Sequence, residues 1–270
     1  MARKLQGISA LRAMFEQAHS QGRAAFLPYF PIGYPDYATS LDIITAMAEA
    51  GVDGFEIGIP FSDPLADGTV IQAATQKALE QGTSVRQCLQ AVRDLRQRGV
   101  HQPMLMMGYA NPLVAFGTER FIEAAYEAGA DGIIVPDLPP EEAHYFSSAC
   151  AKQGMAQIFL CAPTSNAERL HLIAERSTGF IYVVSLTGIT GARRDLPPDL
   201  TDFIARIRQA TQTPLVLGFG ISTPEHARQM NGLVEGFIVG SAVVRAAGEG
   251  VDKVADLVRA LRQALVKADE

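Results

Sequence analysis

The sequence predicts an α/β fold, a single-domain (β/α)8 TIM barrel that spans residues 1–270. Short apolar runs alternate with longer amphipathic runs along the whole chain, as strands that alternate with helices do. Most short runs are continuously apolar, which is typical of parallel strands covered on both faces. The length of 270 residues is close to the usual size of one such barrel, about 250 residues.

Eight apolar runs are predicted strands because each is short and bounded by turn residues. Two of them share a lead-in, at 50–54 and 128–132, in which a glycine ends a helix and the chain turns back into the sheet. The predicted strands are Ala24–Tyr29, Gly54–Ile57, Met104–Gly108, Gly132–Val135, Gln157–Leu160, Phe180–Val184, Leu215–Leu217 and Gly236–Val239.

Helical patterns occupy the intervals between these strands, and some lie outside the simple repeat. We expect extra helices at the N-terminus, after strand 2 and after strand 8. An open doubly wound sheet is the alternative fold, but the G-x-G-x-x-G turn that would favour it is missing after the first strand. The helical patterns include Tyr37–Ala50, Val70–Gln81, Ser84–Arg98, Thr118–Ala128, Glu141–Gln153, Glu168–Glu175 and Leu200–Ala210.

The composition excludes several classes of protein. Hydrophobic residues make up 48% of the chain and charged residues 19%, which excludes a disordered or fibrous protein. The net charge of -6 argues against nucleic acid or an anionic membrane as a partner. The cysteines, Cys88, Cys150 and Cys161, are scattered and odd in number, so we expect a cytoplasmic protein rather than a disulfide framework.

The second predicted strand carries a carboxylate, Glu56, within an apolar run. A buried carboxylate costs several kcal/mol unless it is paired or used in chemistry. At a strand end that faces a pocket, such a group could have a raised pKa and act as an acid and a base in turn. The alternative is a buried structural ion pair.

Other polar residues follow predicted strands, where the active site of this fold lies. Asp67 precedes a helical pattern, so it is either a site residue or the N-cap of that helix. Asp63 precedes a proline and is most simply a turn residue. Asp137 follows the fourth strand and is either a site candidate or part of a loop that begins a helix. Tyr182 lies within the sixth strand, where an aromatic residue usually packs in the core.

Two glycine turns predict a phosphate site. Gly218-Phe219-Gly220-Ile221-Ser222 follows the seventh strand, and Gly240-Ser241 follows the eighth and opens a short helical stretch. Glycines let backbone N–H groups approach an anion, and a helix N-terminus adds partial positive charge. The loops after strands seven and eight are the common phosphate site of this fold.

Two kinds of chemistry lack the residues they need. No lysine falls at a predicted strand end, so a Schiff-base mechanism is disfavoured. The histidines are dispersed, so we expect no metal site. We therefore expect a substrate that carries its own electron sink.

The string GFEIGIPFSDPLADG at 54–68 resembles the signature of the tryptophan synthase α subunit family. The resemblance spans essentially the whole chain and continues through 26–29, 108–112, 135–139, 182–185, 188–191 and 218–222. The chain departs from the family pattern at Pro31, where threonine is usual, and at Thr69, where proline is common. These departures affect only the fine shape of the first two loops.

The resemblance implies a lyase of tryptophan biosynthesis that cleaves indole-3-glycerol phosphate to indole and D-glyceraldehyde 3-phosphate. It implies that Glu56 is the catalytic acid and base, that Asp67 accepts a hydrogen bond from the indole N–H, and that Tyr182 lines the site. Thr190 would contact Asp67 from a closing loop, 186–198. The implied indole slot is formed by Tyr29, Met107, Tyr109, Ile134, Leu160 and Ile238. The implied phosphate-binding residues are Gly191, Gly220, Gly240 and Ser241.

The resemblance also implies a partner, because the family forms an α2β2 heterotetramer. Indole passes there to a β subunit that holds pyridoxal phosphate, so no cofactor is expected in this chain. We expect coupling through 60–67 and 186–198. A stand-alone indole-releasing lyase and a catalytically silent regulatory barrel remain alternatives. Indole-glycerol-phosphate synthase, another barrel enzyme, would need a strand-end lysine.

Overall fold

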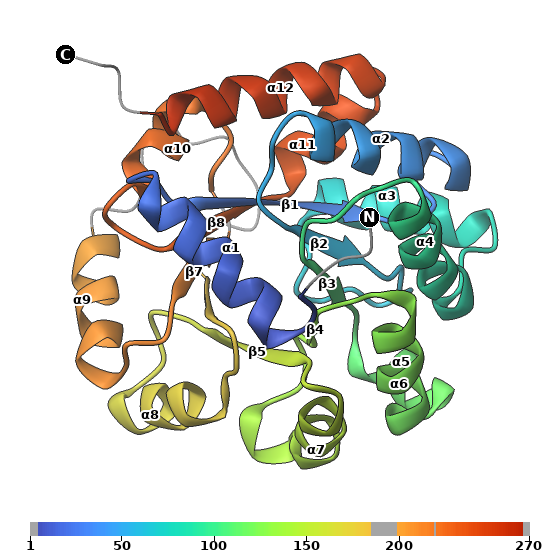
Figure 1. Cartoon of the computed structure of the whole chain (residues 1–270). Coiled ribbons are helices and arrows are strands. Elements are labelled where there is room, and N and C mark those ends of the chain that lie inside the picture. The colour runs from blue at the N-terminus through green and yellow to red at the C-terminus, as the bar shows by residue number, and fades with distance from the viewer. Residues whose placement is uncertain (1–4, 185–198, 219, 267–270) are drawn as a thin grey trace.

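The strands form a closed ring surrounded by helices (Figure 1). The computed structural model describes residues 5–184, 199–218 and 220–266, in which eight parallel strands pair in sequence order and the last closes on the first. This ring confirms the predicted (β/α)8 barrel. The strands are β1 (Ala25–Pro31), β2 (Phe55–Gly58), β3 (Met104–Met107), β4 (Gly132–Ile134), β5 (Ala156–Cys161), β6 (Ile181–Val184), β7 (Leu215–Gly218) and β8 (Gly236–Val239).

The predicted extra helices are present at all three places. Helix α1 precedes β1, α3 and α4 both lie between β2 and β3, and α11 and α12 follow β8. The helices are α1 (Ile8–Ser20), α2 (Tyr37–Glu49), α3 (Thr69–Glu80), α4 (Val85–Gln97), α5 (Ala110–Phe116), α6 (Thr118–Ala128), η1 (Pro140–Glu142, a 3₁₀ turn), α7 (His144–Gln153), α8 (Ala167–Arg176), α9 (Leu200–Ala210), α10 (Pro224–Met230), α11 (Ser241–Ala247) and α12 (Val251–Ala264).

The structure differs from the sequence prediction in two helices. The predicted helix Glu141–Gln153 is wrong at its start, because the 3₁₀ turn η1 ends before α7 begins at His144. Helix α5 was not predicted, since it has only 7 residues and no long periodic pattern. Its first residue, Ala110, donates its N–H to the carboxylate of Asp137 in the loop after β4. That cap comes from another loop, so the local sequence does not reveal it.

Alternate residues of each strand face the interior of the barrel. A Cβ atom on Gly54 would lie 2.9 Å from the Met14 sulfur and 3.3 Å from a Leu27 methyl group, so this row faces inward. Tyr29 is two residues beyond Leu27 and is the Cα partner of Glu56. Residues paired in this way share a face of the sheet, so the side chains of Tyr29 and Glu56 both point into the barrel.

Helix α1 closes the N-terminal end of the barrel, and it crosses in front of the strands in Figure 1. Its Met14 reaches the interior row at Gly54. Its Phe15 packs edge-on against Phe180, with ring centroids 6.0 Å apart. Apolar side chains of α1 therefore fill the barrel interior at this end, and the candidate site residues lie toward the opposite end, where the strands have their carboxyl termini.

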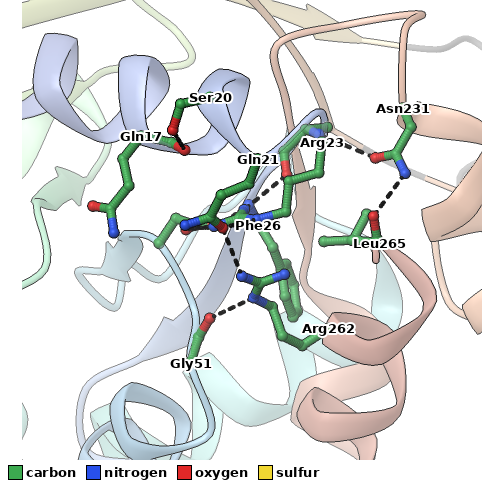
Figure 2. A network of polar contacts seen from close by, with 11 residues as sticks. Gln17, Ser20, Gln21, Arg23, Phe26, Gly51, Asn231, Arg262 and Leu265 are labelled. Atoms are coloured by element: carbon green, nitrogen blue, oxygen red, sulfur yellow. Dashed lines mark hydrogen bonds and ion pairs between the residues drawn. The ribbon is translucent and has the colours of Figure 1, made fainter. Parts of the chain in front are cut away.

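A polar network joins distant parts of the chain beside this closed end (Figure 2). Arg23 donates two hydrogen bonds of 2.7 Å to the carboxylate of Asp53; the Arg23 side chain is buried and that of Asp53 is 10% exposed. Arg262 of α12 donates to the backbone oxygen of Gly51 and to the Gln21 side chain. The loops after α1 and before β2 are thereby joined to the last helix of the described chain.

Candidate active site

The carboxyl group of Glu56 is buried within the barrel. Glu56 is the second residue of β2 and is 1% exposed. Neither carboxyl oxygen has a hydrogen-bond partner among the described residues. Burial raises the pKa of Glu56 well above its usual range, and the nearby charge of Asp67 raises it further. The alternative of a structural ion pair is therefore not supported within the described ranges, and Glu56 holds its proton at higher pH than a solvated glutamate.

Asp67 brings a second carboxyl group to the same place. It lies in the loop between β2 and α3, is 8% exposed, and accepts a hydrogen bond of 3.2 Å from the hydroxyl of Tyr109. Burial raises the pKa of Asp67 to about 6, although the Tyr109 hydrogen bond lowers it. The N-cap alternative is wrong, because Gly68 is the N-cap of α3 and no side chain caps that helix.

Tyr109 fastens the loop that carries Asp67, which the sequence did not reveal. The Tyr109 hydroxyl accepts a hydrogen bond of 2.9 Å from the backbone N–H of Ala66, besides donating to Asp67. Its ring packs against Phe61 of the same loop, with centroids 5.3 Å apart. The residues lie 42 and 43 positions apart in the chain, so only the fold brings them together.

Two tyrosines lean across glycines of neighbouring strands. A Cβ atom on Gly58 would lie 2.4 Å from the Tyr29 hydroxyl, and one on Gly218 would lie 2.2 Å from the Tyr182 hydroxyl. Each glycine therefore leaves the space that a tyrosine ring occupies. The pKa of Tyr182 is raised by burial and then by the charges of Glu56 and Asp67, so this phenol lies near both carboxyl groups. Tyr182 is thus both buried and part of the site.

The apolar residues predicted for the slot share the inward face. Met107 pairs with Ile134, Leu160 pairs with Tyr182, and Ile238 pairs with Gly218. Leu160 is partly exposed and the others are buried. The structure thus brings these side chains to the same interior face as the tyrosines and Glu56.

Glycine turns follow β7 and β8, and the turn after β8 lies beside this interior. Gly220 has a φ of +84°, and a Cβ atom there would meet nothing within 4 Å. A Cβ on Gly240 would lie 3.2 Å from Ile71 and 3.5 Å from the Cβ of Tyr29, so this turn adjoins the tyrosine. Ser241 begins α11. Thr190, Gly191 and the predicted closing loop 186–198 lie outside the described residues.

Two other aspartates lie outside the buried group. Asp63 is exposed and accepts a hydrogen bond from its neighbour Ser62, as a turn residue does. Asp137 is exposed and caps α5. Within the described ranges, no group of three or more His, Cys, Asp or Glu residues could hold a metal ion. No helix in the same ranges has both the length and the apolar character to cross a membrane.

The two buried carboxyl groups differ in what they can do. With its pKa of about 6, Asp67 is mostly ionised at neutral pH, whereas Glu56 is fully buried and retains its proton more strongly. A neighbouring acid and anion allow proton donation together with stabilisation of positive charge. A closed barrel that buries such a pair of carboxyl groups in its interior has the architecture of a barrel enzyme.

Comparison with known proteins identifies the family. A family model described as tryptophan synthase alpha chain matches residues 15–269. The tryptophan synthase alpha chain of Roseiflexus sp. (strain RS-1) is 45% identical, covering 94% of this chain and 100% of the relative. The tryptophan synthase alpha chain of Geobacter sulfurreducens is 41% identical, and the match covers 96% of this chain and 99% of that relative. The chain belongs to the tryptophan synthase alpha chain family, and it is therefore a lyase of tryptophan biosynthesis, as the sequence predicts.

Solved structures agree with this assignment. A structure of Mycobacterium tuberculosis tryptophan synthase superposes with a TM-score of 0.90 at 36% identity, covering 96% of this chain and 98% of that chain. Tryptophan synthase subunit alpha of Legionella pneumophila str. Paris superposes with a TM-score of 0.87 at 34% identity, covering 95% and 98%. The barrel described above is therefore the fold of this family.

Proposed function

We propose that the chain cleaves indole-3-glycerol phosphate to indole and D-glyceraldehyde 3-phosphate, with Glu56 as the acid and base and Asp67 as the stabilising anion. The observation that carries this proposal is the Glu56 carboxyl group, which is buried without a partner among the described residues. Such a group is costly unless it has a chemical use. The adjacent Asp67 supplies a negative charge at neutral pH.

The substrate supplies its own electron sink, the indole ring. Glu56 donates a proton to ring carbon C3, and Asp67 stabilises the positive charge that develops on the ring nitrogen. The Glu56 carboxylate then removes the proton of the side-chain hydroxyl next to C3. The carbon–carbon bond breaks, its electrons return to the ring, and the hydroxyl carbon becomes the aldehyde. Glu56 ends protonated, as it began.

The remaining proposed residues hold the substrate. Tyr29, Tyr109, Tyr182 and the apolar side chains Met107, Ile134, Leu160 and Ile238 would line the indole slot. Gly220, Gly240 and Ser241 would hold the phosphate through backbone N–H groups. Support comes from the open space at Gly220 and from the contact distance between Gly240 and Tyr29. The proposed roles of Thr190 and Gly191 depend on residues outside the described ranges.

We also propose that the chain works in an α2β2 complex with a tryptophan synthase β subunit, which would hold the pyridoxal phosphate. The loop 60–67 links the site to the surface, because Asp67 is buried while Leu65 is 93% exposed. Val114 on α5 is another exposed apolar residue. The three buried free thiols support the proposed cytoplasmic location.

The test is to supply indole-3-glycerol phosphate to the purified chain, alone and with a β subunit and serine. We expect indole and D-glyceraldehyde 3-phosphate from the chain alone, and tryptophan with faster cleavage when the β subunit is added. Equal cleavage rates in the two arms would identify a stand-alone lyase. A β subunit that becomes more active while no substrate is cleaved would identify a silent regulatory barrel.

A further inference from the structure

A cavity lies between helices α3 and α11, which are neighbours in the outer ring of helices (Figure 1). Its volume of about 580 Å³ is within the range of small-molecule sites, about 300–1,000 Å³. Thr69, Ala73 and Lys77 of α3 line it and are exposed, whereas Ile71 of the same helix is buried. The cavity is therefore on the outer side of α3, and the residues that line it include none of the candidate active-site residues.

Two cationic side chains line this cavity. The Nζ atom of Lys77 lies 5.6 Å from the centre of the Tyr34 ring, so its charge is placed beside an aromatic wall. Arg245 lines the cavity from α11. In the part of the chain that the structure describes, neither Lys77 nor Arg245 makes an ion pair or a hydrogen bond. Both charges are therefore available to an anion.

One acidic side chain of the chain itself lies near this pair. Asp36 is close enough to Lys77 for the two charges to interact. Its two carboxylate oxygens accept hydrogen bonds of 2.8 and 2.7 Å from Thr39 at the start of α2, and Asp36 does not line the cavity. An anion from solution can therefore reach the two cations inside the cavity.

The other walls of the cavity are mostly apolar. The apolar residues that line it are Val70, Ala73, Ala74 and Val244. Tyr34 extends between the two helices, because its ring lies beside Lys77 and its hydroxyl would lie 3.5 Å from a Cβ atom on Gly248, the C-cap of α11. A flat apolar group can pack against these walls while an attached anionic group meets the cations.

We propose that this cavity is a second binding site, for a small aromatic carboxylate. The aromatic ring would pack against Tyr34 and the apolar walls, and the carboxylate would lie between Lys77 and Arg245. An inorganic anion would leave the apolar walls in water, and an uncharged aromatic molecule would leave both cations without a partner. Arginine is suited to this role because its guanidinium group matches the two oxygens of a carboxylate.

The walls of the cavity connect it to the candidate active site. Helix α3 begins at Thr69, directly after Asp67 and Gly68, and α11 begins at Ser241 in the proposed phosphate turn. A ligand between these two helices acts on both ends of the substrate site. We therefore expect the occupant to change the KM for indole-3-glycerol phosphate. This coupling rests on the proposed function, whereas binding to the cavity does not.

The first test is calorimetric titration of the purified chain with 2-naphthoate. An excess of an indole-bearing phosphate analogue of the substrate is present, so that the indole slot is already filled. We expect a Kd of about 1 mM or tighter, from the usual binding free energy per ligand atom. 2-Naphthamide, the uncharged counterpart, should bind about tenfold more weakly, because it cannot pair with the two cations.

Variants show where the carboxylate binds. Lys77→Met and Arg245→Met should each weaken binding about fivefold, the upper end for an ion pair that water can reach. Lys253→Met, the same change at an exposed lysine of α12, should leave binding unchanged. These side chains are all exposed, so the variants should fold, and their melting temperatures check this. Unchanged affinity in Lys77→Met and Arg245→Met, or equal binding of naphthoate and naphthamide, would overturn the proposed site.

Turnover tests the coupling separately. Saturating 2-naphthoate should change the wild-type KM about fivefold, the low end of the usual coupling between two sites. It should change KM much less in the double variant Lys77→Met/Arg245→Met. The same KM change in both proteins would mean that naphthoate acts in the indole slot, and it would overturn the coupling. Absence of cleavage by the wild-type chain would refute the proposed function, whereas the calorimetric titration would still decide whether the cavity binds an aromatic carboxylate.

Discussion

Replacing Tyr109 by phenylalanine removes one oxygen atom that makes two contacts in the site. The Tyr109 hydroxyl donates to Asp67 over 3.2 Å and accepts from the N–H of Ala66 over 2.9 Å. The ring remains, so its packing against Phe61 should be kept. The variant therefore tests whether this hydroxyl sets the ionisation of Asp67.

The size of the effect follows from the geometry. A hydrogen bond to a charged group contributes about 1.5–3 kcal/mol, and the low end applies because 3.2 Å is long for an O–H donor. Since about 1.4 kcal/mol corresponds to one pKa unit, the pKa of Asp67 should rise by about one unit. From a starting pKa of about 6, the ionised fraction of Asp67 at about pH 7 would fall from roughly nine-tenths to roughly half.

The assay is the pH dependence of kcat/KM for cleavage of indole-3-glycerol phosphate. Cleavage needs ionised Asp67, so activity is lost as the pH falls through its pKa, and the acidic limb should move up by about one unit in Tyr109→Phe. Tyr37→Phe is the matched control, because Tyr37 donates a similar hydrogen bond to Asp94 away from the site. An acidic limb that stays in place in Tyr109→Phe would refute this account of Asp67.

Three further predictions concern stability and substrate binding. Glu56→Gln should stabilise the protein, and the gain should be larger at about pH 8 than at about pH 5. The reason is that the pKa of Glu56 is raised in the folded protein, so the wild type loses stability as the pH rises. A difference in melting temperature that does not depend on pH would contradict this prediction. Gly220→Val should raise KM about tenfold or more, equivalent to roughly 1.4 kcal/mol of binding free energy, because the side chain would fill the proposed phosphate space. Gly232→Val is the control, since Gly232 has a similar positive φ and equally open surroundings, and it should leave KM unchanged. Asp53→Asn should lower the free energy of unfolding by about 3–5 kcal/mol in urea titrations, since it leaves Arg23 buried without its partner; a loss below about 1 kcal/mol would show that the pair is not needed.

The barrel could be predicted because its signals are local. Continuous apolar runs gave each strand to within a few residues, and glycine lead-ins marked the approach to β2 and β4. Helix α5 was not predicted, because it is short and its N-terminus is capped by Asp137 from another loop. The break between η1 and α7 was not predicted, because a 3₁₀ turn and an α-helix have similar periodicity over so few residues.

The site could be predicted in part, for the same reason. A carboxylate in an apolar strand draws attention to Glu56 without any structure. The links between site residues could not be predicted, because they join different elements. Tyr109 reaches Asp67 across 42 positions, and the rings of Tyr29 and Tyr182 depend on space left by Gly58 and Gly218 on neighbouring strands. The register between neighbouring strands and the direction of each side chain determine such contacts, and the local sequence does not specify either one.

The central claim is that Glu56 carries out both proton transfers, and one variant tests it most directly. Glu56→Gln keeps the side-chain volume but can neither donate nor accept the proton. We expect binding of a phosphate analogue of the substrate to change little, while kcat falls by at least about 10²–10⁴-fold, the usual contribution of general acid–base catalysis. Both quantities are to be measured on the same purified, folded protein. A kcat within about tenfold of wild type, with ligand binding intact, would contradict the mechanism and leave Glu56 as a structural residue.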